Sequence, residues 1–348
     1  MKEIIIRTNF NIKVGLGHFF RCKILKEQFE KKKFKVTFVI DNNTKSKLTE
    51  NLNILDLGQK KFNYLEDSKL VYEKIKNKNV FLILVDDYRI DFRWEKIFVK
   101  KGYKVAIIDD LANRKHCCNF LIDSGWYGRE ENVKRYSKLV NKKTITLYGP
   151  HYKILNPKIK KIKKKEFSIM FYFGGGNYLN NYYKIINDLI KKIDQFKIKV
   201  KINIIVSGLF KLNKKINTEH KQVKIIKNNY ELSEIINNTS LYIGSNSSIV
   251  NDLSYLKIPR ILISVNKLQN ININTYQDLG NYIYIKYPFT QSLDKISKLI
   301  FDVIKNFIRV KNLFLNPKIK IDKNGADRIV KILIKKIDVE KNKRKATR

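Results

Sequence analysis

Short apolar runs alternate with longer segments of helical period along most of the chain. The short runs predict strands and the longer segments predict helices. The predicted strands cover residues 4–7, 36–40, 54–57, 80–86, 105–109, 120–123, 144–147, 167–173, 200–207, 223–226, 241–244 and 260–264. The helical patterns include residues 18–32, 91–101, 179–196, 230–238 and 248–256. Alternation of this kind favours parallel sheets with helices on both faces.

The alternation is interrupted by a lysine-rich stretch that contains Pro157 and predicts a linker. A strand–helix series lies on each side of it, and 348 residues suffice for two domains with separate cores. We therefore expect an α/β fold of two doubly wound Rossmann-like domains with a cleft between them, where such folds bind ligands. The expected parts are a first domain at residues 1–156, a linker at 157–166, a second domain with a closing helix at 167–337, and a disordered basic tail at 338–348.

A formal net charge of +40 is the strongest bias in the composition and invites a nucleic-acid or membrane partner. The lysines are spread along the whole chain, whereas a binding surface needs charge gathered on one face. Clusters occur at residues 158–165 and 341–348, and charge runs of this kind are usually solvated linkers or tails. No pattern typical of an RNA- or DNA-binding module accompanies them. We therefore expect no nucleic-acid partner.

The cysteines Cys22, Cys117 and Cys118 predict neither a disulfide framework nor a zinc site. Two of them are adjacent, and no second Cys/His pair is present. Free thiols indicate a reducing, cytoplasmic setting. No apolar run approaches the ~18 residues of a membrane span, so we expect no membrane insertion. No metal or cofactor is expected, and a monomer is favoured.

The loop after the first predicted strand contains Gly15 and Gly17 and leads into a helix that begins near His18. Glycines let the backbone approach a ligand, and a helix N-terminus offers free N–H groups. The third glycine of a dinucleotide fingerprint is missing. Histidine titrates near neutrality, and a helix N-terminus disfavours its charged form, so His18 is a candidate general base. The alternative is a surface histidine beside a helix cap.

A glycine run directly follows the first strand of the second half and includes Gly174 and Gly175. At the carboxyl end of a strand, such a run lets a phosphate or a sugar pass close to the backbone. A flexible turn is the alternative interpretation.

A second candidate binding loop contains Ser247 and Ser248, at a strand-to-helix connection. Hydroxyls and helix N–H groups suit a diphosphate. Asn251 and Asp252 follow in the helix, and Asp252 could accept hydrogen bonds from ribose hydroxyls. An ordinary serine cap with an acid in the first turn explains the same pattern.

Two pairs of acids end predicted strands, Asp86-Asp87 and Asp109-Asp110. Carboxylates at strand ends indicate an active-site edge, although polar turns use them too. Adjacent residues in an extended chain point to opposite faces, so neither pair is predicted to act as a carboxylate dyad.

Taken in order, seven segments resemble one known family. They are Gly15-Leu16-Gly17-His18 with Arg21-Cys22, Asp86-Asp87-Tyr88 with Trp94-Glu95, Ile108-Asp109-Asp110-Leu111-Ala112-Asn113-Arg114 with His116-Cys117, Tyr148-Gly149-Pro150-His151-Tyr152, Gly174-Gly175-Gly176-Asn177, Ser247-Ser248-Ile249-Val250-Asn251-Asp252, and Ile321-Asp322 with Gly325-Ala326 and Arg328. The family is the UDP-2,4-diacetamido-2,4,6-trideoxy-β-L-altropyranose hydrolases of pseudaminic acid synthesis, with their spore-coat-polysaccharide relatives. The resemblance runs essentially from end to end.

The resemblance implies a GT-B-type fold in which the second domain holds the nucleotide. The implied reaction is hydrolysis of the anomeric C–O bond of a UDP-sugar, without a metal. His18 would activate water, and Tyr88 would orient the water or the sugar. Ser247 and Ser248 would hold the diphosphate, and Asp252 the ribose.

Several positions depart from the family pattern, and they put the identity of the sugar in doubt. Asp87 replaces a common histidine, Gly176-Asn177 replaces Ser/Thr-Asp, Asn156 replaces arginine, Asp252 replaces glutamate, and Asn119 replaces aspartate. The histidine motif itself is retained. The alternatives are a GT-B glycosyltransferase that uses a UDP-sugar and a nucleotide-sugar-binding protein without catalysis.

Overall fold

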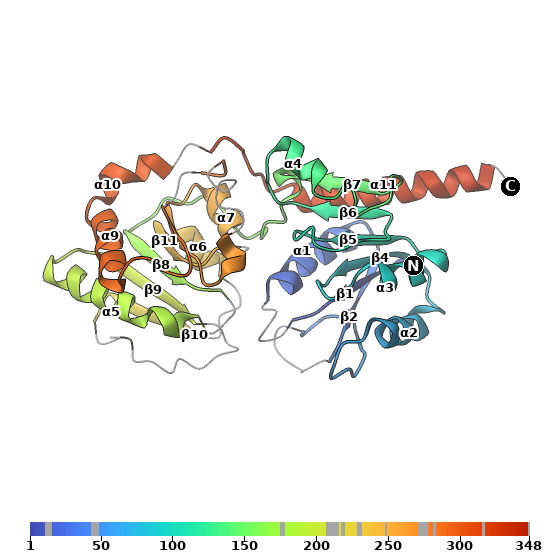
Figure 1. Cartoon of the computed structure of the whole chain (residues 1–348), viewed down its shortest axis with the longest axis horizontal. Coiled ribbons are helices and arrows are strands. Elements are labelled where there is room, and N and C mark those ends of the chain that lie inside the picture. Colours follow the sequence, from blue (N-terminus) through green and yellow to red (C-terminus); the bar gives the residue numbers. More distant parts are fainter. Residues whose placement is uncertain are drawn as a thin grey trace. The chain divides into compact units, whose positions relative to one another are not determined.

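The computed structural model of the chain describes residues 1–10, 16–42, 49–174, 178–206, 216, 220–227, 232–247, 249–270, 278–280, 283–314 and 317–346. The chain forms two compact units, which Figure 1 labels by element. The first unit contains Met1–Leu155 and Asp322–Arg348, and the second contains Asn156–Ile321.

The first unit is built on a seven-stranded parallel sheet with the order β3-β2-β1-β4-β5-β6-β7. Its strands are β1 (Glu3–Thr8), β2 (Lys35–Ile40), β3 (Ile54–Asp56), β4 (Val80–Asp86), β5 (Val105–Ile108), β6 (Phe120–Asp123) and β7 (Ile145–Tyr148). The connecting helices are α1 (Gly17–Lys31), α2 (Tyr64–Ile75), α3 (Phe92–Lys100), α4 (Arg129–Lys134) and η1 (Pro150–Tyr152). Every residue of β1 is buried, as expected for a parallel strand covered on both faces.

The second unit repeats this plan with a six-stranded parallel sheet of order β10-β9-β8-β11-β12-β13. Its strands are β8 (Ser168–Tyr172), β9 (Lys201–Val206), β10 (Val223–Lys227), β11 (Leu241–Gly244), β12 (Arg260–Ile263) and β13 (Ile283–Ile285). Its helices are α5 (Leu179–Gln195), α6 (Ser233–Asn238), α7 (Ile249–Leu256), η2 (Lys267–Asn270), α9 (Leu293–Lys305), α10 (Phe307–Val310) and η3 (Lys311–Phe314).

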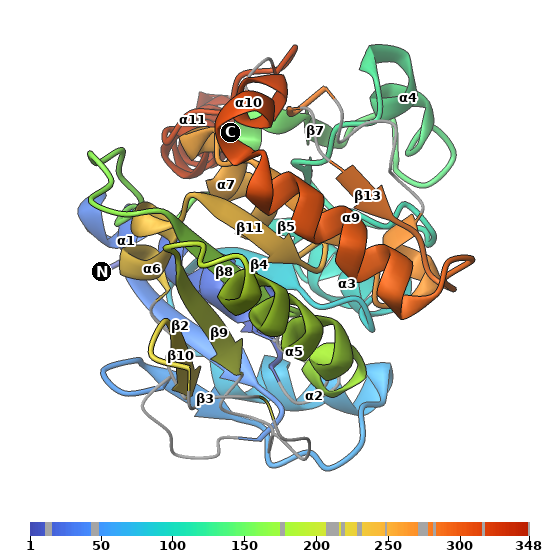
Figure 2. The same ribbon diagram turned by 90° about the vertical axis from the view of Figure 1, so that its left-hand side faces the viewer.

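Helices cover both faces of the second sheet. Ile169 and Phe171 of β8 pack in one cluster with α5 and α9, which lie side by side in Figure 2. Met170, between them in sequence, packs in another cluster with α6 and α7. This division follows from the two-residue period of a strand. The prediction of two doubly wound α/β domains is therefore confirmed. No helix in the described ranges is long and apolar enough to cross a membrane.

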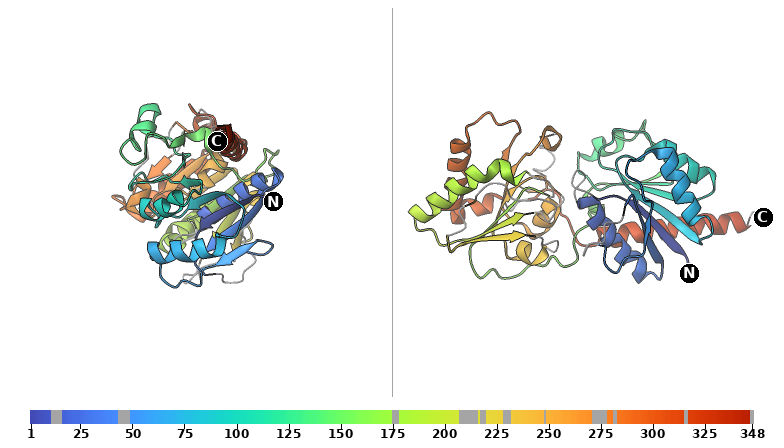
Figure 3. Two further views of the ribbon diagram at one scale, coloured as in Figure 1. Left: turned by 90° about the vertical axis from the view of Figure 1, so that its right-hand side faces the viewer. Right: turned by 90° about the horizontal axis from the view of Figure 1, so that it is seen from below.

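The closing helix α11 (Gly325–Ala346) belongs to the first unit, so its expected place in the second domain is wrong. Its apolar side chains Ile329, Val330, Leu333 and Ile337 are fully buried, and the helix packs against α1 and η1. Figure 3 shows α11 beside the elements of this unit. The expected disordered tail is also wrong, because α11 continues through residues 338–346 and Lys104 forms an ion pair with Glu340.

Candidate active site

The carboxyl ends of β1 and β4 meet at the point where the strand order of the first sheet reverses. Thr8, at the end of β1, is paired with Asp86, at the end of β4. Helix α1 follows β1 along the chain, so His18 is carried to this edge in the first turn of the helix. Doubly wound folds bind their ligands at this topological position.

A short hydrogen bond joins the His18 imidazole to the Asp86 carboxylate. The distance between His18 Nδ1 and Asp86 Oδ1 is 2.6 Å. The Asp86 side chain is fully buried, and that of His18 is 10% exposed. An ionised carboxylate accepts the Nδ1 proton, and the lone pair is then on Nε2. Within the described part of the chain, Nε2 makes no hydrogen bond. In this tautomer, Nε2 is the atom of His18 that can accept a proton.

Arg21 holds Asp86 in its ionised state. Its guanidinium donates to both carboxylate oxygens of Asp86 and to Asp110 Oδ2, at 3.0 Å. Burial alone would raise the pKa of the Asp86 carboxyl, but the charge of Arg21 and the hydrogen bonds from Arg21 and His18 outweigh it and hold this pKa well below its usual range. Asp86 therefore remains an acceptor at any working pH.

The Tyr88 ring packs against the His18 ring. The two rings meet edge to face, with centroids 4.4 Å apart and an interplanar angle of 87°. The Tyr88 hydroxyl donates to Asp110. Burial and the neighbouring Asp110 charge raise the pKa of the Tyr88 phenol well above its usual value, so it remains protonated. Tyr88 fixes one side of the imidazole and cannot itself act as a base near neutral pH.

The structure thus brings together the predicted residues His18 and Tyr88 and adds three charged partners that the sequence argument did not assign. Gly17 is the first residue of α1, whereas Gly15 lies outside the described residues. The missed partners are Arg21, Asp86 and Asp110. The three-residue spacing of His18 and Arg21, which places both on one helix face, was an available signal.

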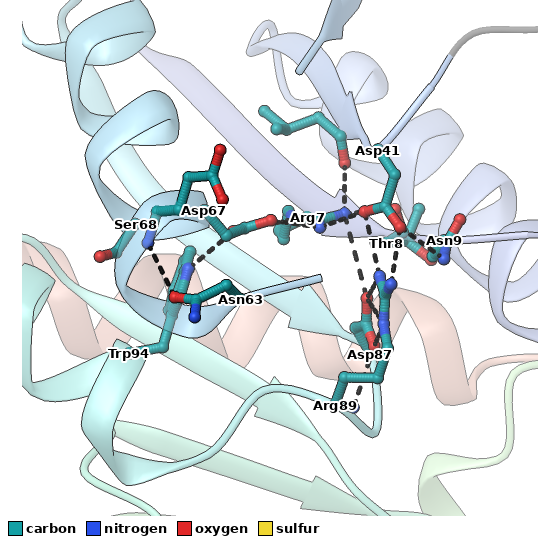
Figure 4. Close-up of polar contacts among 12 residues, drawn as sticks. Arg7, Thr8, Asn9, Asp41, Asn63, Asp67, Ser68, Asp87, Arg89 and Trp94 are labelled. Carbon is teal, nitrogen blue, oxygen red and sulfur yellow. Dashed lines mark hydrogen bonds and ion pairs between the residues drawn. The ribbon is translucent and has the colours of Figure 1, made fainter. Parts of the chain in front are cut away.

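Asp87 points away from His18, so the prediction that adjacent acids face opposite sides is confirmed. It pairs with Arg89 and lies 3.9 Å from the Arg7 guanidinium. Figure 4 shows Arg7 between the carboxylates of Asp41 and Asp67. Arg7 and Asp67 are both fully buried. This network anchors the segment after β4 from the side opposite His18.

Asp109 likewise points away from Asp110 and joins a buried network with His116 and Glu95. His116 Nδ1 lies 2.7 Å from Glu95 Oε1, and His116 Nε2 lies 3.5 Å from Asp109 Oδ2. Burial alone would lower the pKa of His116, but Asp109 and Glu95 outweigh it and raise this pKa to about 9. His116 is thus a buried cation with a structural role.

We expect the stability of the first unit to fall as pH rises through 9. The folded pKa of His116 is raised above the unfolded value of about 6.5, so its contribution is complete below that pH and is lost as His116 deprotonates. The loss should be about 3 kcal/mol. Both tryptophans, Trp94 and Trp126, are in this unit, so tryptophan fluorescence during urea unfolding measures it selectively.

The matched variant is His116→Gln. Its free energy of unfolding should change less than that of the wild type between about pH 6 and pH 10. Equal pH dependence in the two proteins would contradict the assignment.

The candidate nucleotide loops of the second unit lie at the corresponding edge of its sheet. β8 and β11 are neighbours there, and the strand order reverses between them. Gly174 has a φ of 84°, and a side chain at this position would come within 3.4 Å of Ser245 Oγ. Gly175 and Ser248 lie outside the described residues. The structure therefore brings the start of the glycine loop to the β11–α7 connection.

Ser247, Asn251 and Asp252 also lie at this connection and the start of α7. The Ser247 hydroxyl is buried near Tyr242 and has no hydrogen-bond partner among the described residues. The backbone N–H of Asn156 donates to Asp252 Oδ1 at 3.3 Å. These residues offer hydroxyl, amide and carboxylate groups at one sheet edge. In the described ranges, no group of three or more His, Cys, Asp or Glu residues could hold a metal.

No protein-family model matches the chain. An uncharacterized protein of Methanocaldococcus jannaschii is 25% identical over 287 residues, which cover 77% of this chain and 56% of that protein. The chain thus matches little more than half the length of this relative.

Solved structures resemble the chain over nearly its whole length. MurG of Acinetobacter baumannii has a TM-score of 0.63 at 12% identity, covering 96% of this chain and 100% of its own. The UDP-GlcNAc 2-epimerase of Neisseria meningitidis, solved with UDP-GlcNAc bound, has a TM-score of 0.61 at 9% identity, with coverages of 96% and 100%. The chain has the two-domain GT-B type of fold.

Proposed function

We propose that the chain is a UDP-sugar hydrolase that releases UDP and a free diacetamido-trideoxy hexose in nonulosonic acid synthesis of the pseudaminic type. The 2.6 Å hydrogen bond between His18 Nδ1 and Asp86 Oδ1 carries the proposal, because it orients a histidine whose Nε2 is ready to accept a proton. The fold shared with an epimerase that holds UDP-GlcNAc supports a nucleotide-sugar substrate. The seven motifs that resemble the hydrolase family support water as the acceptor.

In the proposed reaction, His18 Nε2 takes a proton from a water molecule as the water oxygen attacks the anomeric carbon. The bond between this carbon and the diphosphate oxygen breaks, and its electron pair leaves with UDP. Asp86 stabilises the imidazolium that forms, and Arg21 keeps Asp86 ionised. Attack on the face opposite the diphosphate inverts the anomeric centre. The proposal assigns the chemistry to the first unit and UDP binding to the second.

The test is nucleotide release from a panel of UDP- and GDP-sugars with no acceptor other than water. Release of UDP and a free sugar of inverted anomeric configuration is the expected result. Release that requires an added sugar or lipid hydroxyl would instead assign a glycosyltransferase. Tight binding without any release would assign a binding protein.

Asp252→Ala should weaken UDP binding by about 1–3 kcal/mol, because it removes a charged acceptor and leaves its donors without a partner. The backbone N–H of Asn156 is one such donor. Calorimetry with UDP measures the effect. Asp302→Ala, at an exposed position of α9 in the same unit, is the matched control. Unchanged UDP affinity in Asp252→Ala would remove this residue from the site.

A further inference from the structure

Lys153 is a buried lysine whose backbone is clamped by the closing helix. It follows η1 and is 9% exposed. Gly325, the first residue of α11, lies so close that a side chain there would come within 2.0 Å of the Lys153 carbonyl oxygen. Arg328 of the same helix donates to the backbone oxygen of His151 at 2.6 Å. These contacts fix the point from which the Lys153 side chain extends.

The Lys153 ammonium makes neither a hydrogen bond nor an ion pair in the described part of the chain. Burial lowers the pKa of Lys153, and the charges of Asp123 and Asp110 act in the opposite direction. Removing an ammonium from water without a partner is costly. A ligand that accepts a hydrogen bond from the ammonium would offset this cost.

Asp123 does not need Lys153 as its partner. Asp123 Oδ1 accepts from the Gly125 backbone N–H at 2.7 Å, and Oδ2 accepts from Arg135 at 2.8 Å and from Tyr136 at 3.1 Å. Both carboxylate oxygens of Asp123 therefore have hydrogen-bond donors other than Lys153. The donors of Lys153 remain available.

The order of the strands places Lys153 and the His18 site at the same edge of the sheet. Asp110 follows β5, Lys153 follows η1 after β7, and only β6 lies between these two strands. Asp110 contacts Arg21 of the His18 site at 3.0 Å. The Asp110 side chain is 32% exposed, so a ligand can reach this position. The carboxyl edge of the first sheet therefore carries His18, the candidate proton acceptor, and Lys153, a cationic hydrogen-bond donor.

We propose that Lys153 donates a hydrogen bond to a neutral oxygen of the substrate's sugar, a hydroxyl or an acetamido carbonyl, and so acts as a specificity residue of the His18 site. Asp110 and Asp123 follow β5 and β6 at the sheet edge where η1 and Lys153 follow β7, and carboxylates at this edge disfavour a phosphate more than a neutral acceptor. The inference rests on the proposed function, because it takes the ligand to be a nucleotide sugar.

The test compares the affinities of UDP-N-acetylglucosamine and UDP for the wild type and for Lys153→Met, by calorimetry. Methionine keeps the apolar stem and removes the donor. Lys153→Met should bind UDP-N-acetylglucosamine about tenfold more weakly and UDP equally well, because only the sugar contact is lost. Lys143→Met, at an exposed turn of the same unit, should bind both as the wild type does.

A melting curve separates recognition from a structural role. Because Lys153 makes no hydrogen bond or ion pair with any described residue, Lys153→Met should melt at the same temperature as the wild type or higher. A lower melting temperature, or equal loss of UDP and UDP-N-acetylglucosamine affinity, would overturn the inference. Unchanged affinity for both ligands would also overturn it and leave the proposed function intact. A wild type that binds neither ligand would reject the proposed function and this inference with it.

Discussion

Replacing His18 by asparagine is expected to reduce UDP-sugar turnover by roughly 10²–10⁴-fold, the usual contribution of a general base. The change removes Nε2, the atom that accepts the proton of the attacking water. UDP affinity should hardly change, because the proposal assigns the nucleotide to the second unit. The reduction should therefore appear in kcat, with little change in the Kd of UDP. Steady-state rates of UDP release and calorimetry measure the two quantities.

His220→Asn is the matched control, since His220 lies in the second unit and contacts Asp194, whose side chain is exposed. It should retain wild-type turnover. Near-normal turnover in His18→Asn would show that His18 is structural. A first-formed sugar that keeps its anomeric configuration would indicate a covalent intermediate, and His18 would then not act directly on water.

Replacing Arg7 by methionine is expected to destabilise the first unit by about 3–5 kcal/mol, because it leaves a buried carboxylate without its counter-ion. Arg89 still pairs with Asp41 and Asp87, so the uncompensated group is Asp67. The Trp94 indole N–H donates to Asp67 at 2.8 Å. Tryptophan fluorescence during urea unfolding therefore reports this network directly.

Arg93→Met is the control for the loss of an arginine, because the Arg93 side chain is 51% exposed. Exposed ion pairs contribute less than about 1 kcal/mol, so this variant should unfold almost as the wild type does. Adding Asp67→Asn to Arg7→Met should recover part of the lost stability, since the buried charge is removed. Additive effects of the two changes would show that Arg7 and Asp67 are not coupled.

The apolar pattern predicted the strands because buried parallel strands are continuous apolar runs. The opposite orientations of Asp86 and Asp87 followed from the two-residue period of a strand. The partners of Arg7 could not be predicted in this way. Asp41 follows β2 and Asp67 lies in α2, and only tertiary packing brings them to β1.

The helical period of α11 predicted a helix but not the unit that it joins. An amphipathic pattern identifies the face of a helix that is buried, but it does not identify the surface against which that face packs. The helix was assigned to the second domain that precedes it in sequence, whereas the complementary surface lies on α1 and η1. The basic residues at the end of this helix have the composition of a solvated tail. Their composition alone does not show that the helix nucleated by the preceding apolar face continues through them.

Because α11 completes the first unit, the second unit is an insertion within the first. On the ribosome, the segment up to Leu155 emerges long before the helix that covers α1. At usual rates of translation, this interval is on the order of 10–40 s. The second unit is contiguous in sequence and can fold during that time. The surface of the first unit that α11 covers, on α1 and η1, stays exposed until α11 is synthesised. The first unit can therefore complete its native fold only after its C-terminal segment, from Asp322 onward, has been synthesised.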